Sequence, residues 1–174
     1  MEPGTRYETM PIPPVPEHTE YVPAGAVVFA VEFRFLTDDI LDAAYEGDEA
    51  GTAIMDAARP DSLDDRGVSV HVFDAATNVE YLRFDCFDDD PHYHYITSAE
   101  GYQRYVRFDT WAQGDMFTWA VACLRTRVGE MLAAAGAAVA AANVDLRTVG
   151  TALDALEELA RVLPERVAAR STQV

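Results

Sequence analysis

Apolar residues alternate with other residues in four separate stretches, and this period of two constrains the fold more than any other feature of the chain. The first stretch has valine or phenylalanine at positions 27, 29, 31, 33 and 35, and the others cover residues 68–72, 82–86 and 92–96. Because successive side chains of a strand point to opposite faces, each stretch predicts a strand with one buried face. Short connections join the last three, which predicts antiparallel hairpins.

Helical signals lie between the first two strands and after the last one. Thr37 precedes two aspartates, which is the pattern of a helix N-cap, and Pro60 predicts an end near residue 58. Residues 115–142 have apolar residues at steps of three and four, and a second such series covers residues 146–163. With the element order βαβββαα, we predict an α+β fold with a mostly antiparallel four-stranded sheet, helices covering one face, and a C-terminal helical hairpin.

Residues 1–25 form a different kind of segment, because they include six prolines. Proline lacks a backbone N–H and favours the extended polyproline II conformation, so this arm is expected to stay out of both the sheet and the helices. Its apolar residues predict that it docks on its own domain or on a neighbouring subunit. We therefore divide the chain into a proline-rich arm, residues 1–25, and a single α+β domain, residues 26–170.

Composition excludes several classes of function. The formal charge of −17 opposes a nucleic-acid partner or an anionic membrane surface, both of which require a basic patch. All 13 basic residues are arginines, so a Schiff-base lysine is excluded. The two cysteines form no Cys-x-x-Cys motif and predict free thiols in a reducing compartment. Without a leader or a long apolar run, the acidic chain is expected in the cytoplasm, and its alanine, arginine and aspartate bias is typical of a bacterial genome rich in GC.

The pairing of the last three strands predicts a polar site. Val70 opposite Phe84 places His71 across from Arg83 and Ser69 across from Asp85, and it leaves Asn78 in the turn with a positive φ. In the next hairpin, we expect Phe87 opposite His92. That register places Asp85 directly across from His94, turns Tyr93 and Tyr95 toward the helices, and sets Phe73 beside Tyr81 on the polar face.

Two chemical roles follow from this arrangement. His71, Asp85 and His94 are candidate ligands of a zinc, manganese or iron ion, with His92 or an aspartate of the turn as a substitute. Asp85, His92 and Tyr81 are candidate catalytic residues for proton transfer beside a metal-bound water. The protein is then a metal-dependent hydrolase or lyase, or binds another small-molecule ligand at this site.

Two alternatives need no catalysis. Asp85 and His94 can form a simple cross-strand ion pair, with His71 stacked on Arg83 or Tyr81. Alternatively, the protein is a non-catalytic subunit of a homo-oligomer or of an assembly with a protein partner. In that case the arm and an exposed aromatic face, formed by Phe73 and Tyr81, bind the partner.

The hairpin segments also resemble a known family. The sequences Val-Ser-Val-His-Val at 68–72, Tyr-Leu-Arg-Phe-Asp-Cys-Phe at 81–87 and Pro-His-Tyr-His-Tyr at 91–95, with the helix near residues 119–127, are similar to a bacterial domain-of-unknown-function family. The proline-rich arm lies outside this similarity. The resemblance implies that the hairpin defines the family, and it implies no particular activity.

Overall fold

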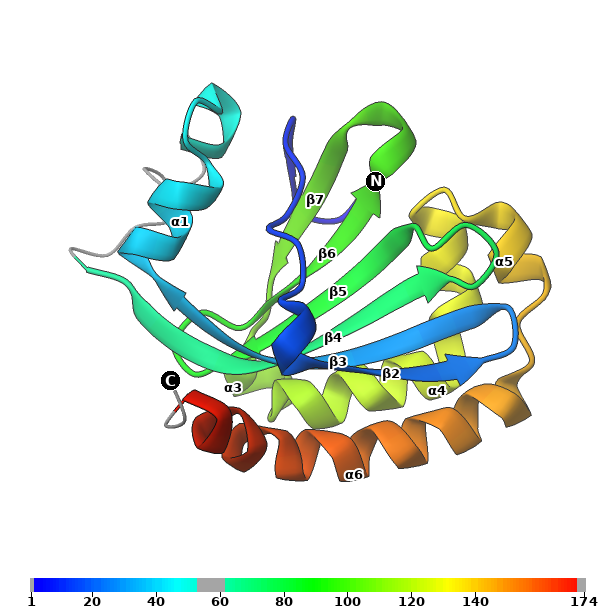
Figure 1. Cartoon of the computed structure of the whole chain (residues 1–174). Coiled ribbons are helices and arrows are strands. Elements are labelled where there is room, and N and C mark those ends of the chain that lie inside the picture. Colours follow the sequence, from blue (N-terminus) through cyan, green and yellow to red (C-terminus); the bar gives the residue numbers. More distant parts are fainter. Residues whose placement is uncertain (1, 53–61, 172–174) are drawn as a thin grey trace.

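The computed structural model describes residues 2–52 and 62–171, and it shows an antiparallel sheet with helices packed on one face (Figure 1). Within these described residues, seven strands form the sheet, in the spatial order β1-β7-β6-β5-β4-β3-β2. Their bounds are Thr5–Tyr7 (β1), Thr19–Ala24 (β2), Val27–Thr37 (β3), Asp64–Asp74 (β4), Glu80–Phe87 (β5), His92–Thr97 (β6) and Tyr102–Arg107 (β7). The predicted α+β class with an antiparallel sheet is confirmed, but the prediction of four strands is wrong.

Three strands were missed, each for a physical reason. β7 carries polar residues on both of its faces, so it lacks a clear alternation of apolar and polar positions. β1 has only three residues. β2 contains Pro23 but is the outermost strand of the sheet, where a missing N–H interrupts no ladder between two neighbours. The expectation that the arm stays out of the sheet is therefore wrong at both β1 and β2.

The helices flank the sheet unequally. Their bounds are Asp38–Ala44 (α1), Thr110–Gln113 (α3), Met116–Ala134 (α4), Ala138–Ala142 (α5) and Leu146–Ser171 (α6), with single 3-10 turns at Pro16–His18 (η1) and Ser98–Glu100 (η2). α4 packs on β5, and α6 packs on β3 and β2. α1 continues from β3 and rises on the other side of the sheet from α4 and α6 (Figure 1). We call the sheet face that lies opposite α4 and α6 the pocket face.

The predicted helix boundaries are partly right. Thr37 caps α1 by accepting a hydrogen bond from the backbone N–H of Ile40. The rest of that prediction, at residues 53–58, lies outside the described residues. The single helix expected over 115–142 is divided into α4 and α5 at Gly136, which has a φ of 93°. Glycine adopts this left-handed conformation without strain, and here it ends α4.

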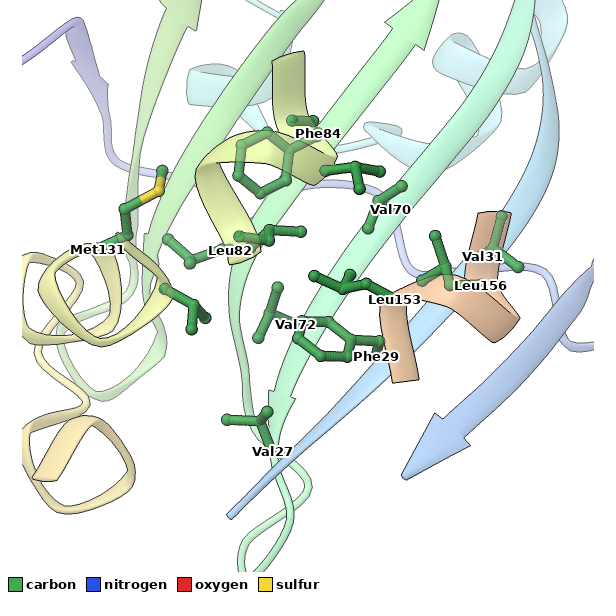
Figure 2. Packing of buried hydrophobic residues seen from close by; sticks show 14 of the residues in the cluster. Val27, Phe29, Val31, Val70, Val72, Leu82, Phe84, Met131, Leu153 and Leu156 are labelled. Atoms are coloured by element: carbon green, nitrogen blue, oxygen red, sulfur yellow. The ribbon is translucent and has the colours of Figure 1, made fainter. Parts of the chain in front are cut away.

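The hydrophobic core fills the space between the sheet and the two long helices. Alternate residues of the four central predicted stretches enter it, as the period of two requires. Figure 2 shows this packing, in which the labelled sheet residues Val27, Phe29, Val31, Val70, Val72, Leu82 and Phe84 meet Met131 of α4 and Leu153 and Leu156 of α6. Burying this one face leaves the alternate, mostly polar residues of the same strands on the pocket face.

The arm crosses the pocket face from one edge of the sheet to the other. β1 pairs with β7 at one edge, β2 pairs with β3 at the opposite edge, and residues 8–15 connect the two sides (Figure 1). We call residues 8–15 the strap. The strap therefore docks on its own domain, which is one of the two positions expected for the arm, and it covers polar residues that an open sheet would expose to water.

Candidate functional site

The pocket face contains an unusual number of buried polar side chains. The charged or polar residues with less than one tenth of their surface exposed include Glu32, Arg34, Ser69, His71, Arg83, Asp85, His92, His94 and Gln103. Burial of a charged group is costly unless that group is paired and hydrogen-bonded. Most of these residues belong to two groups with different partners.

The first group consists of Asp85, His92 and His94, which we call the His–Asp cluster. The Nε2 atom of His94 lies 3.1 Å from Oδ2 of Asp85, and the Nε2 atom of His92 lies 3.4 Å from the same oxygen. The three candidate ligand atoms lie within 4.8 Å of one another. Tetrahedral zinc with bonds of about 2.0 Å keeps its ligand atoms roughly 3.3 Å apart. The two measured separations are close to that spacing.

Neighbouring groups orient two members of the cluster. The Ser69 hydroxyl donates a 2.5 Å hydrogen bond to Oδ1 of Asp85, which leaves Oδ2 directed at the histidines. Nδ1 of His92 donates to the backbone oxygen of Asp90 at 2.6 Å. The Tyr105 hydroxyl donates to Oδ2 of Asp90 at 2.6 Å, and its ring lies 4.4 Å from that of His92. Such outer partners commonly fix the orientation of metal-binding imidazoles.

The charges of the cluster are strongly coupled. Burial alone would raise the pKa of Asp85, but hydrogen bonds from His92 and His94 outweigh it and hold this pKa well below its usual range. Burial would lower the pKa of His92, but Asp85 reverses the effect and raises it. Burial lowers the pKa of His94 to about 4. The cluster thus holds one carboxylate, one imidazole that favours a proton and one imidazole that stays neutral.

His94 has a further property that bears on ligand binding. Among the residues that the structure describes, its Nδ1 atom is buried without a hydrogen-bond partner. A neutral imidazole has one lone pair and one N–H, so His94 can exchange the proton between its two nitrogens. With the proton on Nε2, which faces Asp85, Nδ1 of His94 offers its lone pair to a ligand, unlike the Nδ1 atom of His92.

The second group holds the strap and contains Glu32, Arg34, His71, Glu80 and Arg83. Arg83 donates from Nε and Nη2 to the two carboxylate oxygens of Glu80, at 2.9 and 2.7 Å. His71 lies between two carboxylates, 2.7 Å from Glu80 and 3.2 Å from Glu32. We call this group the strap anchor.

The strap anchor binds backbone atoms of the strap. Nη1 of Arg83 donates to the oxygen of Ile12 at 2.6 Å, and Nη2 of Arg34 donates to the oxygen of Pro13 at 2.7 Å. The backbone N–H of Val15 donates to Oε1 of Glu32 at 2.9 Å. Because prolines leave few N–H groups in the strap, its carbonyl oxygens are the natural acceptors for buried arginines.

A pocket of about 520 Å³ opens beside both groups. The strap, α1, β3, β5, β6, β7 and the segment before β4 all contribute to its wall. Asp85, His92 and His94 line it, together with Tyr105, Gln103 and Arg107 of β7. Small-molecule sites are typically clefts of roughly 300–1,000 Å³ with mainly apolar walls and a few convergent polar groups. The pocket face thus provides a cavity of suitable size with the His–Asp cluster in its wall.

The predicted register is right in the first hairpin. Val70 pairs with Phe84, His71 with Arg83 and Ser69 with Asp85. Asn78 has the expected positive φ, of 59°. A bulge near the end of this ladder pairs Phe73 with Glu80 instead of Tyr81.

The predicted register of the second hairpin is wrong by two residues. Asp85 pairs with His92, and His94 pairs with Arg83. The carboxylate of Asp65 accepts the backbone N–H groups of Asp89 and Asp90, which stabilises a longer turn than expected. Because the register differs from the predicted one by two residues, each side chain stays on the predicted face of the sheet. His94 therefore still reaches Asp85, as a diagonal neighbour.

The structure separates some of the predicted site residues. It brings Asp85, His92 and His94 together, while His71 belongs to the strap anchor and stacks on Phe73 with a centroid distance of 6.0 Å. Tyr81 lies at the bulge, packs against the hydrophobic core and is not among the pocket-lining residues. Phe73 is only 7% exposed. The exposed aromatic face expected from Phe73 and Tyr81 is therefore absent from the described structure.

Several site residues were missed by the sequence analysis. Tyr105 and Gln103 belong to β7, a strand without a clear apolar alternation. The role of Asp90 depends on its backbone oxygen as well as its carboxylate, and only the former contacts His92 at hydrogen-bond distance. A weak signal existed in the sequence, because Tyr105 and Gln103 are two residues apart and share one face of any extended strand.

One of three comparisons with known proteins gives a match. No curated protein and no solved structure matches the chain. Within the described residues, no helix has the length and apolar character needed to cross a membrane. The family model described as "Domain of unknown function (DUF7700)" matches residues 21–160, which include β3–β7 and the whole His–Asp cluster. The chain therefore belongs to this domain-of-unknown-function family.

Proposed function

We propose that this protein is a metal-dependent enzyme that acts on a small molecule, with Asp85, His92 and His94 as the ligands of one divalent ion. The observation that carries the proposal is the convergence of two imidazole Nε2 atoms on one buried carboxylate oxygen in the wall of a pocket. Three protein ligands leave a coordination position for water or substrate. His92 takes the place predicted for His71.

The hydrogen bonds of His92 support a cation at this position. Its Nδ1 proton is donated to the oxygen of Asp90, so Nε2 of the neutral ring would direct a lone pair at the Asp85 carboxylate. That contact is favourable only with a positive charge between the two atoms, supplied either by a proton or by a metal ion. Nitrogen and carboxylate ligands without a thiolate suit zinc, manganese or iron.

The chemistry of such a centre follows from its open position. A divalent ion lowers the pKa of bound water and polarises oxygen atoms of a substrate, which serves hydrolysis or a lyase reaction. The chain's own contribution is to orient the ligands through Ser69 and Asp90 and to enclose the substrate under the strap.

Metal binding is tested directly by thermal unfolding. Chelator-treated protein is titrated with zinc, manganese or iron(II), and the wild type is compared with His94→Ala and Asp85→Asn. At an ion concentration about 100 times Kd, binding to the folded state adds about 2.7 kcal/mol of stability, which a melting curve detects. We expect the wild type to show the shift and both variants to lose it, with elemental analysis of the purified protein as a second measurement.

His18→Ala is the matched control, because His18 belongs to η1 and does not line the pocket. It should keep the full metal-induced shift. If the wild type, His94→Ala and His18→Ala all show equally unchanged melting temperatures with every ion, the metal proposal is wrong.

A metal-free acid–base site is the second candidate, and the raised pKa of His92 favours it. In this version, His92 transfers a proton at the pocket wall and Asp85 stabilises its charged form. The same titration separates the two candidates, since only the metal centre requires an ion-dependent shift. Tyr81, predicted to take part in proton transfer, has no place in either proposal because it packs against the core.

A further inference from the structure

We infer that the ligand of this pocket is a small molecule with an apolar body and an oxygen-containing head group that also carries a hydrogen-bond donor. The inference rests on the proposed metal centre for the position of the head group. The observations that indicate the apolar body and the hydrogen-bond donor of the ligand do not depend on a metal. The apolar body, the donor and the metal centre can therefore be contradicted separately.

The apolar body is indicated by the apolar residues that line the pocket. They come from the strap, β3, α1 with the residue that follows it, and the segment before β4, namely Pro11, Ile12, Leu36, Leu41, Tyr45 and Leu63. All six are partly exposed, so removing them from water would favour binding of an apolar group. The His–Asp cluster, on β5 and β6, supplies part of the polar lining of the same cavity.

The donor on the head group is indicated by Gln103. Its side chain is only 3% exposed and lines the pocket. Within the described part of the chain, its Oε1 atom is buried without a hydrogen-bond partner. Buried acceptors are nearly always satisfied, and one left open in a pocket wall favours a ligand that donates an N–H or O–H.

The position of Gln103 places this donor near the His–Asp cluster. His94 pairs with Tyr105 across β6 and β7, and Gln103 is two residues from Tyr105 on the same face. Diagonal neighbours in a sheet lie about 7 Å apart, within the span of one compact head group. A head group that binds at His94 can therefore also reach Gln103.

The proposed divalent ion favours oxygen over ammonium in the head group, because a second cation beside the ion would be repelled. Oxygen is also the head-group atom that such an ion can coordinate. A hydroxamate fits all three requirements, because it has two oxygens that coordinate metal, an N–H donor and an alkyl chain of variable length.

The test is a calorimetric titration with aceto-, butano- and hexanohydroxamate, performed on both zinc-loaded and metal-free protein. If the alkyl chain enters the apolar part of the pocket, each added methylene should tighten binding roughly threefold to fourfold. Leu41→Ala should reduce this gain, and Leu36→Ala, on a different element, should do the same. Ile40→Ala is the control, because Ile40 is on the same helix but does not line the pocket.

A second comparison tests the donor. In zinc-loaded and in metal-free protein alike, Gln103→Leu should weaken binding of acetohydroxamate at least fivefold and leave binding of N-methylacetohydroxamate, which lacks the N–H, nearly unchanged. Equal effects on the two compounds would overturn the role of Gln103.

The outcomes distinguish this inference from the proposed function. Zinc binding without any gain from chain length overturns the apolar body and leaves the metal centre intact. A chain-length gain that depends on Leu41 in metal-free protein, without zinc binding, supports the body and overturns the metal centre. If the protein shows no zinc binding and no gain from chain length, both the inference and the metal centre are overturned.

Discussion

Nη1 of Arg83 donates a 2.6 Å hydrogen bond to the backbone oxygen of Ile12, which lies 71 residues earlier in the chain. The same guanidinium holds both carboxylate oxygens of Glu80. One buried cation thus joins the strap to the middle of the sheet, and both the cation and the strap line the pocket. The stability of the strap and the shape of the pocket therefore depend on the same side chain.

Replacing this cation should be costly. We expect Arg83→Met to lower the free energy of unfolding by about 3–5 kcal/mol, because it leaves Glu80 buried without its main partner. Urea denaturation measures the change. Arg161→Met is the control, since Arg161 pairs with Glu158 on the surface, where its side chain is 71% exposed. A loss of similar size in both variants would show that Arg83 has no special role.

Removing the strap should affect stability and the pocket together. Deletion of residues 2–15 removes the acceptors of Arg34 and Arg83, so we expect a lower free energy of unfolding and weaker ligand binding with the helical content retained. Deletion of residues 2–10 is the matched control, because it removes β1 but keeps Ile12, Pro13 and Val15. If the longer deletion is no more harmful than the shorter one, the strap anchor is not important for stability.

The same deletions test self-association. The proposal that the arm supports a homo-oligomer or binds a protein partner predicts fewer chains per particle in solution for the protein without residues 2–15. Light scattering coupled to size-exclusion chromatography gives the mass of the particle, and division by the mass of one chain gives this number. An unchanged number of chains, together with an arm that NMR shows to be mobile in the intact protein, would contradict the proposal.

Acid should destabilise the protein partly through His94, whose pKa is lowered to about 4 in the folded state. Between pH 6.5 and 4 the unfolded chain binds a proton at this residue and the folded chain does not, so stability falls as the pH falls. A shift of this size corresponds to about 3 kcal/mol across that window. His94→Gln should flatten this part of the pH profile, and an unaltered slope would contradict the assignment.

Tyr105 should influence metal binding without contacting the ion. Its hydroxyl holds the carboxylate of Asp90, whose backbone oxygen accepts the proton of His92 Nδ1. Outer partners of this kind typically contribute about 10–100-fold to metal affinity. We expect Tyr105→Phe to reduce zinc affinity measurably, by up to about 100-fold. Tyr7→Phe, also beside the pocket, should leave zinc affinity nearly unchanged. Equal affinities in both variants would show that Tyr105 does not position His92.

The sequence was sufficient to predict the central strands and the face on which the site lies. Val70 and Phe84 are apolar at alternate positions, and Asn78 tolerates a positive φ, so local rules set the first hairpin correctly. The second hairpin depends on Asp65, whose carboxylate binds the backbone of a turn more than 20 residues away. That contact has no local signal, and it changes the partner of Asp85.

The membership of the cluster was only partly predictable for a related reason. His71 and His94 look equivalent in sequence, since each lies on a strand beside Asp85. In the structure, Glu32 and Glu80 surround His71 and leave it no nitrogen directed at the cluster. Glu32 belongs to β3, which pairs with β4, and the paired residues of these two strands are far apart in the sequence. Tyr81 was misplaced by one bulged residue, which no alternation pattern reveals.

The two outer strands also affect how the protein behaves at high concentration. An exposed sheet edge can add a strand from another molecule and so begin aggregation. Here one edge is β1, with three residues, and the other is β2, in which Pro23 cannot donate a backbone hydrogen bond. Glu20 of β2 also lies near Arg166 and Arg170 of α6, which adds charge beside that edge. The proline-rich arm lines the pocket, and its two strands should also protect the sheet against growth into fibres.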